Sequence, residues 1–355
     1  MKAVRFHAKG DVRVEDVPAP SKPLGDHEVL IKPIACGICG TDLHEYLAGP
    51  IVTPVEPHPL SGATNPQILG HEFSALVVDK GKAVTNVAID DRVSIQPLVT
   101  PRNDYFAKRG LYHLNPNMAA IGLSWPWGGM GEYAVVNDYN VTRIPPTLTD
   151  IQGALVEPGA VALYGVERGG VRAGSTVLVS GAGPIGAMTV LAARAAGASL
   201  IFVSEPNEVR RNIATGLVPG VIAIDPNNAD VLTIIRDMTE EGVGVDVAIE
   251  CVGLERSLNL CADAVRRGGK VVQVGLHMKR ASIDAMLWAQ KDITLEATWC
   301  FEVEMWPRII SMIENGLYPV ERIVTSEIAA EDVVEKGFKE LLNPSGKNLK
   351  VLVRI

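Results

Sequence analysis

The chain has 355 residues, which is enough for two domains of ordinary size. Hydrophobic residues make up 47% and charged residues 21%, the profile of a globular protein that folds in water. The net charge of −8 argues against nucleic acid as a partner, because phosphate binding needs a basic face. Five cysteines, an odd number in a long chain, favour reduced thiols over a disulfide framework.

The amino-terminal residues 1–6 alternate like a strand and lack the apolar core of a signal peptide. The longest apolar stretch, residues 186–203, is interrupted by Arg194 and Gly197. It is typical of a buried helix followed by a strand and not of a membrane span. We therefore expect a cytoplasmic protein with no membrane partner.

Two patterns of predicted secondary structure follow one another along the chain. Up to about residue 150, short β-type runs such as 29–32, 75–78 and 133–136 are separated by turn residues, as in an irregular β-barrel. After Glu157, strands alternate with helices, which indicates a parallel, doubly wound sheet. β-type texture returns from about Thr294. The expected division is therefore residues 1–156 and 297–355 for the β domain, with residues 157–296 inserted.

A glycine-rich turn follows the strand predicted at 176–180, and the predicted helix begins at Pro184. In such a turn Gly181 makes the tight bend, Gly183 lets the backbone approach a pyrophosphate, and Gly186 lets helix pack on strand. The amino terminus of the helix, at Pro184 and Ile185, supplies N–H groups and a partial positive charge. These five residues are the candidate phosphate-binding segment of a dinucleotide site.

The acidic Glu205 closes the next predicted strand and is the candidate partner of the adenosine ribose hydroxyls. Its charge would repel a 2′-phosphate, so NAD is favoured over NADP. Arg210 and Arg211 leave an alternative open, since a guanidinium nearby could hold a phosphate. Either arginine could instead be a solvated helix residue, or Arg210 could lie beside the adenine.

The first half of the chain carries side chains that a zinc ion accepts. Cys39 offers a thiolate, and Gly70-His71-Glu72 offers an imidazole and a carboxylate. Glu157 adds a second carboxylate at the boundary of the predicted domains. Taken one by one, each side chain could equally be buried for structural reasons. Together with a dinucleotide motif they suggest metal-assisted hydride transfer.

This combination resembles the zinc-dependent medium-chain alcohol and polyol dehydrogenases, and the resemblance extends over essentially the whole chain. It rests on residues 37–46, on 57–60, on 70–73, on 155–158 and on 205–207, which look most like (R,R)-2,3-butanediol dehydrogenases. The resemblance implies a GroES-like β-barrel catalytic domain with an inserted Rossmann domain. It also implies a homodimer or homotetramer.

The resemblance also implies roles for individual residues. Cys39, His71, Glu72 and Glu157 would be ligands of one catalytic zinc, with the two glutamates alternating with water. Thr41 and His44 would relay a proton from the substrate oxygen, with Glu72 beside them at the reacting centre. In addition, Asp42 would orient His71, and Cys36 would be a buried structural residue.

The chain departs from the family in one segment. Many members carry four cysteines in the pattern C-G-x-C-x-x-C-x-x-G-x-x-x-x-C, which hold a structural zinc. Aligned on Gly110, the four positions here are Pro101, Asp104, Ala107 and Asn115. Because a structural zinc needs four ligands, mostly sulfur, we expect no structural zinc. Packing by Tyr105, Phe106, Leu111 and Tyr112 is the candidate replacement.

The expected reaction is reversible NAD-linked oxidation of a secondary alcohol, with 2,3-butanediol and acetoin as the substrate pair. Sorbitol- or threonine-type dehydrogenases are the near alternatives, and a non-catalytic NAD-binding protein is the distant one. Trp125 and Trp127 could wall a small apolar pocket, or could equally pack on the surface of the domain.

Overall fold

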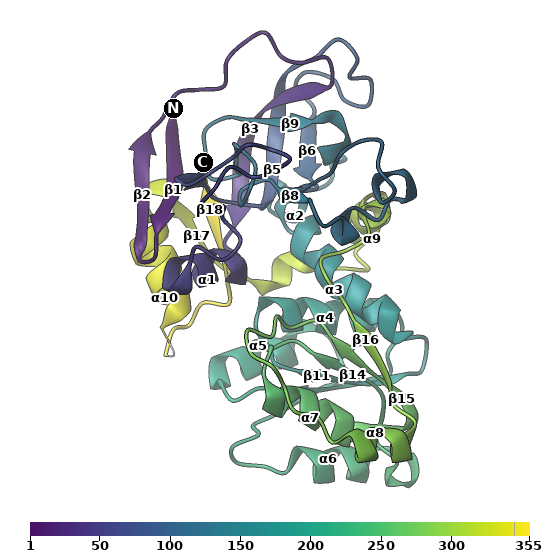
Figure 1. Ribbon diagram of the computed structural model, residues 1–355. Helices are drawn as coiled ribbons and strands as arrows, with labels where there is room; N and C mark the ends of the chain where they lie inside the picture. Colours follow the sequence, from purple (N-terminus) through teal and green to yellow (C-terminus); the bar gives the residue numbers. More distant parts are fainter. Residues whose placement is uncertain (344) are drawn as a thin grey trace. The chain divides into compact units, whose positions relative to one another are not determined.

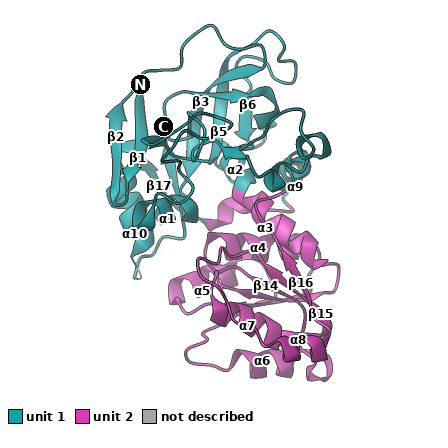
Figure 2. Cartoon of the chain, in the orientation of Figure 1, with its two compact units in different colours: residues 1–157, 302–316, 324–355 teal, residues 158–301, 317–323 magenta. Residues whose placement is uncertain are grey.

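The computed structural model describes residues 1–343 and 345–355. The chain divides into two compact units (Figure 2). Unit 1 consists of residues 1–157, 302–316 and 324–355, and unit 2 of residues 158–301 and 317–323. Among the residues described, no helix is both long enough and apolar enough to cross a membrane.

Unit 1 is built on an open barrel of mainly antiparallel strands in the order β10-β6-β5-β3-β18-β17, with β9 also paired to β3 (Figure 1). A three-stranded sheet, β2-β1-β4, and the pair β7-β8 complete its strands. Their bounds are β1 Lys2–Ala8, β2 Asp11–Asp16, β3 Glu28–Gly37, β4 Gln67–Ile68, β5 Glu72–Lys80, β6 Arg92–Ile95, β7 Leu98–Val99, β8 Ala119–Ala120, β9 Ala134–Asn137, β10 Val141–Arg143, β17 Val324–Ala329 and β18 Lys350–Arg354. The helices assigned to this unit are α1 Gly40–Ala48, α2 Asp150–Ala154, α9 Trp306–Glu314 and α10 Lys339–Leu342.

The barrel core follows from the alternation of the strands. Along β3 and β5 the inward positions carry Val29, Ile31, Phe73, Ala75 and Val77, all fully buried. These side chains belong to one apolar cluster. Because successive side chains of a strand point to opposite faces, the residues that alternate with these five point to the other face of the sheet. The long β3·β5 ladder places the end of β3 against the start of β5, where Gly37 pairs with Glu72.

Unit 2 is a six-stranded parallel sheet in the order β13-β12-β11-β14-β15-β16. Helices alternate with its strands, which is the doubly wound arrangement expected from the sequence. The strands are β11 Thr176–Ser180, β12 Leu200–Ser204, β13 Val221–Ile224, β14 Val245–Glu250, β15 Val265–Gln273 and β16 Thr294–Ala297. The helices are α3 Val156–Gly169, which begins in the last residues of unit 1, α4 Pro184–Ala195, α5 Glu208–Leu217, α6 Val231–Met238, α7 Glu255–Ala264 and α8 Ala285–Lys291.

The boundaries of the units differ from the expected ones in two places. The chain returns to unit 1 at Glu302 and not at Ala297, because β16 is the last strand of the parallel sheet and pairs with β15. The interpretation of residues 294–298 as a return of the barrel was therefore wrong. In addition, residues 317–323 belong to unit 2, where the Tyr318 hydroxyl donates to the carbonyls of Gly159 and Met188.

Candidate metal centre and cofactor site

Three side chains at one end of the barrel form a cluster of metal donors. Cys39 follows the end of β3, while His71 and Glu72 stand at the start of β5. One donor atom from each lies within 4.8 Å of the others. His71 and Glu72 are buried, with 6% and 1% of their surface exposed. A sulfur, an imidazole nitrogen and a carboxylate oxygen at this spacing suit a zinc ion.

The electrostatics of the cluster also suit a cation. Burial raises the pKa of the Cys39 thiol well above its usual range, and the Glu72 carboxylate adds to the effect. Burial likewise raises the pKa of Asp42. A thiolate and carboxylates are held together in a dry site only when positive charge compensates them. A divalent ion at the three donors would supply that charge.

Asp42, on the first turn of α1, lies beside the ring of His71. The Asp42 Oδ1 and His71 Nδ1 atoms are 3.7 Å apart. Both atoms are buried, and neither has a hydrogen-bond partner among the residues described. The other Asp42 oxygen, Oδ2, accepts a hydrogen bond from the Cys39 backbone N–H at 2.9 Å. Asp42 is thus placed to fix both the cysteine backbone and the imidazole, as carboxylates beside ligating histidines do.

Lys350, at the start of β18, was not singled out from the sequence. It is 1% exposed and forms an ion pair with the Glu72 carboxylate. Its ammonium also donates to the carbonyl of Ile38 at 2.9 Å. Burial disfavours the charged ammonium, but Glu72 and Cys39 outweigh it and hold the pKa of Lys350 above its usual value. The structure thus supplies one fixed cation to the acidic cluster.

Glu157 lies at the edge of the cluster, on the first turn of α3. It is 7% exposed, and burial raises its pKa to about 8. His71 opposes that rise and Glu72 reinforces it, so the carboxyl is close enough to both to interact with them electrostatically. It does not belong to the group of donor atoms that lie within 4.8 Å of one another.

The candidate proton-relay residues lie on α1, one turn apart. Thr41 is the nearer to the cluster, since its hydroxyl oxygen lies 3.7 Å from the Cys39 sulfur. His44 is exposed. Residues three apart on a helix share a face, so Thr41 and His44 lie on the same face of α1.

In unit 2 the glycine-rich turn has the expected backbone. Gly181 has a φ of +96°, which other residues rarely adopt, and its N–H donates to the Ser204 carbonyl at 2.8 Å. A side chain at Gly186 would collide with the Gly181 carbonyl, so glycine is required there for helix α4 to pack closely. Pro184 lies in the first turn of α4 and Ile185 follows it. Gly183 has open space beside it, which leaves room for a ligand.

Glu205 lies just beyond β12 and is 4% exposed. One of its oxygens accepts from the Ala182 N–H and the other from the Asn207 N–H, both at 2.8 Å. A carboxylate has about four acceptor sites, so two remain for ribose hydroxyls. The Arg211 guanidinium is engaged by the carbonyls of Glu205 and Pro206 and by Asp225. Arg210 stands on the first turn of α5 and is half-buried.

A second buried carboxylate, Glu250, was also missed. It lies at the end of β14 and accepts hydrogen bonds from the Val252 and Gly253 N–H groups at 2.7 and 2.8 Å. The Ser257 hydroxyl donates to it at 2.6 Å, and the His277 ring lies 3.2 Å away. Glu250 thereby ties the loop after β14 to the loop after β15. Ligands of doubly wound sheets bind at this carboxyl-terminal edge.

The tryptophans of the segment 124–129 pack on the barrel. Both are half-buried against the apolar cluster of unit 1. The Trp125 indole N–H donates to the Val135 carbonyl at 3.0 Å. Of the two alternatives that the sequence left open for Trp125 and Trp127, these contacts correspond to packing on the domain and not to lining a pocket.

Comparison with known proteins identifies both halves of the chain. Residues 25–146 match the alcohol dehydrogenase GroES-like domain, and residues 184–315 match the zinc-binding dehydrogenase family. The GroES-like and Rossmann expectations are thereby confirmed. The (R,R)-butanediol dehydrogenase of Bacillus subtilis is 37% identical over 100% of this chain and 99% of its own length. The crystal structure of the B. subtilis enzyme superposes with a TM-score of 0.93 over the same shares.

Two other relatives widen the range of the match. Human sorbitol dehydrogenase is 31% identical over 98% of this chain and 94% of its own length. The structure of a zinc-binding dehydrogenase from Sinorhizobium meliloti, bound to NADP, is 30% identical, with a TM-score of 0.88 and coverage of 100% and 99%. The chain therefore belongs to the zinc-dependent medium-chain alcohol and polyol dehydrogenases, enzymes that act with a nicotinamide cofactor.

Proposed function

We propose that the protein interconverts a vicinal diol and its acyloin, with 2,3-butanediol and acetoin as the pair, using NAD. The observation that carries the proposal is the buried cluster of Cys39, His71 and Glu72 in a chain matched over its full length by an (R,R)-butanediol dehydrogenase. A vicinal diol suits such a centre, because its second oxygen offers another polar contact.

The site residues would share the work as follows. Cys39 and His71, with Glu72 and Glu157 as carboxylate ligands, would hold one zinc, which acts as a Lewis acid on the alcohol oxygen when bound. Asp42, 3.7 Å from His71, would hold its ring in the orientation that leaves the other ring nitrogen for the metal. Thr41 would accept a hydrogen bond from the substrate hydroxyl and give up its own hydroxyl proton as the substrate proton arrives. His44, exposed on the same face of α1, would then pass a proton to solvent.

The cofactor would bind along the carboxyl edge of the parallel sheet. Gly181, Gly183, Pro184, Ile185 and Gly186 would hold the pyrophosphate at the amino terminus of α4. Glu205 would accept hydrogen bonds from the adenosine ribose, and Arg210 would lie beside the adenine. NAD is favoured because a 2′-phosphate would meet the buried Glu205 carboxylate, while Arg211 is already engaged.

The metal content and assembly belong to the same proposal. We expect one zinc per chain and no structural zinc. The described cysteines form no disulfide, which is consistent with the cytoplasm. Exposed apolar side chains on unit 2, including Leu276, Met278 and Trp299, support a homodimer or homotetramer.

The test is a substrate panel run with a metal assay. Purified protein is analysed for zinc. Oxidation of 2,3-butanediol, sorbitol and threonine is measured with NAD and NADP, and reduction of acetoin with NADH and NADPH. We expect the highest kcat/KM for butanediol and acetoin with the NAD couple. A higher value for sorbitol would favour the polyol alternative, which the match to human sorbitol dehydrogenase supports. Cofactor binding without turnover of any substrate would leave only the non-catalytic alternative.

A further inference from the structure

The segment that holds a structural zinc in many relatives has a different chemistry here. We call residues 101–118, between β7 and β8, the lobe. It contains two short 3-10 helices, Ala107–Arg109 and Tyr112–Leu114. The four positions that align with cysteines carry no thiol. Within the described part of the chain, the group of metal donors found is Cys39, His71 and Glu72, which lies outside the lobe. A structural zinc therefore does not fit.

One carboxylate connects three of those four positions. Asp104 Oδ1 accepts a hydrogen bond from the backbone N–H of Ala107 at 2.7 Å. Asp104 Oδ2 accepts a hydrogen bond from the side-chain amide of Asn115. Asn115 is 6% exposed, and its own amide oxygen accepts from the N–H of Asn117 at 2.8 Å. The carboxylate thus joins the first turn of the lobe to its last residues, as a tetrahedral metal would.

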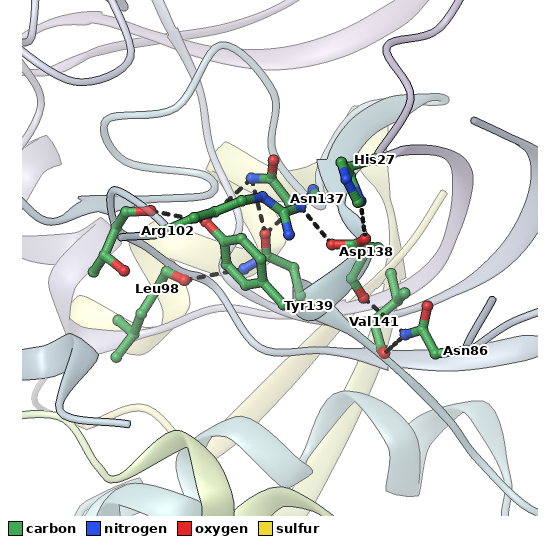
Figure 3. A network of polar contacts seen from close by, with 10 residues as sticks. His27, Asn86, Leu98, Arg102, Asn137, Asp138, Tyr139 and Val141 are labelled. Carbon is green, nitrogen blue, oxygen red and sulfur yellow. Dashed lines mark hydrogen bonds and ion pairs between the residues drawn. The ribbon is translucent and has the colours of Figure 1, made fainter. Parts of the chain in front are cut away.

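The lobe is also fastened to the barrel (Figure 3). The Arg102 guanidinium forms an ion pair with Asp138 at 2.5 Å and lies over the Tyr139 ring, 4.9 Å from its centroid. Tyr139 in turn donates to the Thr100 carbonyl at 3.2 Å. The Tyr112 ring meets the Tyr139 ring edge-on, with 5.5 Å between centroids. Arg102 at the start of the lobe and Tyr112 in its second 3-10 helix therefore contact the same aromatic ring.

Of the four candidate packing residues, Tyr112 makes this contact with the barrel. Tyr105 does not pack inward: it is 62% exposed and lies beneath the Arg109 guanidinium, 3.9 Å from ring centroid to guanidinium carbon. The lobe thus has polar contacts centred on Asp104 in addition to the packing of Tyr112.

We propose that the hydrogen bonds of Asp104 to Ala107 and Asn115 close the lobe in place of a structural metal. The lobe then stays folded when a chelator removes zinc from the protein. Charged acceptors make the stronger class of hydrogen bond, and here the amide donor, Asn115, is only 6% exposed. This inference does not depend on the identity of the substrate.

Limited proteolysis of the full-length protein tests it. Lys108 and Arg109 are exposed inside the lobe and are trypsin sites, and exposed Lys82 in the same unit gives an internal reference. Cleavage at each site is timed by mass spectrometry, with and without EDTA. In the wild type we expect EDTA to leave the ratio of lobe cleavage to Lys82 cleavage unchanged within about twofold. In Asp104→Ala we expect that ratio to rise about tenfold or more, in either condition.

Matched variants distinguish loss of the Asp104 hydrogen bonds from a general loss of stability. Asn103→Ala changes the exposed neighbour of Asp104 and should behave as wild type. The double variant Asp104→Asn with Asn115→Asp exchanges the partners and should recover most of the protection. If Asp104→Ala does not fold, Asp104→Asn alone should give an intermediate ratio. The proposal is overturned if EDTA opens the lobe of the wild type, if elemental analysis finds two zinc ions per chain, or if Asp104→Ala and Asn103→Ala are cut equally fast.

Discussion

Lys350→Met is the substitution that most directly tests the electrostatics of the metal centre. The ammonium of Lys350 is buried and paired with Glu72, and it lies in a cluster that also contains Cys39 and Asp42. Methionine has a similar length and no charge. The substitution therefore leaves the buried Glu72 carboxylate without its fixed cation while keeping most of the packing.

The size of the effect follows from the burial of the pair. Both side chains are 1% exposed, so solvent screens their interaction very little. Removing one partner of a buried ion pair costs about 3–5 kcal/mol of stability. In a unit of about 200 residues, that corresponds to a fall in Tm of roughly 6–20 °C.

The assay is thermal unfolding followed by circular dichroism, on chelated and on zinc-loaded protein. A matched control is Arg354→Met on the same strand, because the pair of Arg354 with Glu327 is about 40% exposed on both sides and should contribute about 1 kcal/mol or less. Zinc should raise the Tm of Lys350→Met more than that of the wild type, since the ion supplies the missing charge. Lys350→Arg should stay closer to wild type. If Lys350→Met loses no more stability than Arg354→Met in the chelated state, the account of this pair is wrong.

Three further predictions concern single residues. Cys39→Ser should abolish turnover and bound zinc while NAD binding by fluorescence titration stays near wild type; full activity would rule out the assigned ligand. Glu205→Ser should narrow the preference for NAD over NADP, and an unchanged ratio of kcat/KM for the two cofactors would contradict the charge argument. Glu157 has a pKa raised to about 8, so the chelated protein binds a proton that the unfolded chain releases above pH of about 4.5. Its stability should therefore fall as pH rises from about 5 to 8, by up to about 1.4 kcal/mol per pH unit, and Glu157→Gln should remove that slope in denaturant titrations.

Local patterns predicted the parts of the protein whose chemistry is local. The turn at Gly181–Gly186 and the acidic Glu205 lie within one strand-helix-strand unit, so their spacing in the sequence reflects their spacing in space. The same holds for Cys39 and Asp42 on one helical turn. The sequence pattern did not distinguish β16 from a barrel strand, because a short run of strand-forming residues does not indicate which sheet the strand joins.

The buried charges could not be foreseen in the same way. Lys350 is 278 residues from Glu72, and a lysine at the start of a strand is ordinarily solvated. Its role depends on β18 pairing with β3, a long-range contact that no local pattern encodes. For the lobe, the sequence showed only that the four cysteines are missing. Which groups replaced them needed the positions of Ala107 and Asn115.

Glu250 has a further consequence for the loops at the carboxyl-terminal edge of the sheet in unit 2. Because one carboxylate accepts hydrogen bonds from the loop after β14 and also contacts His277 in the loop after β15, neither loop opens without exposing a buried charge. We therefore expect the two loops to move together. Because the loops are already held together, we expect a ligand that binds there to lose little binding free energy to ordering their backbone.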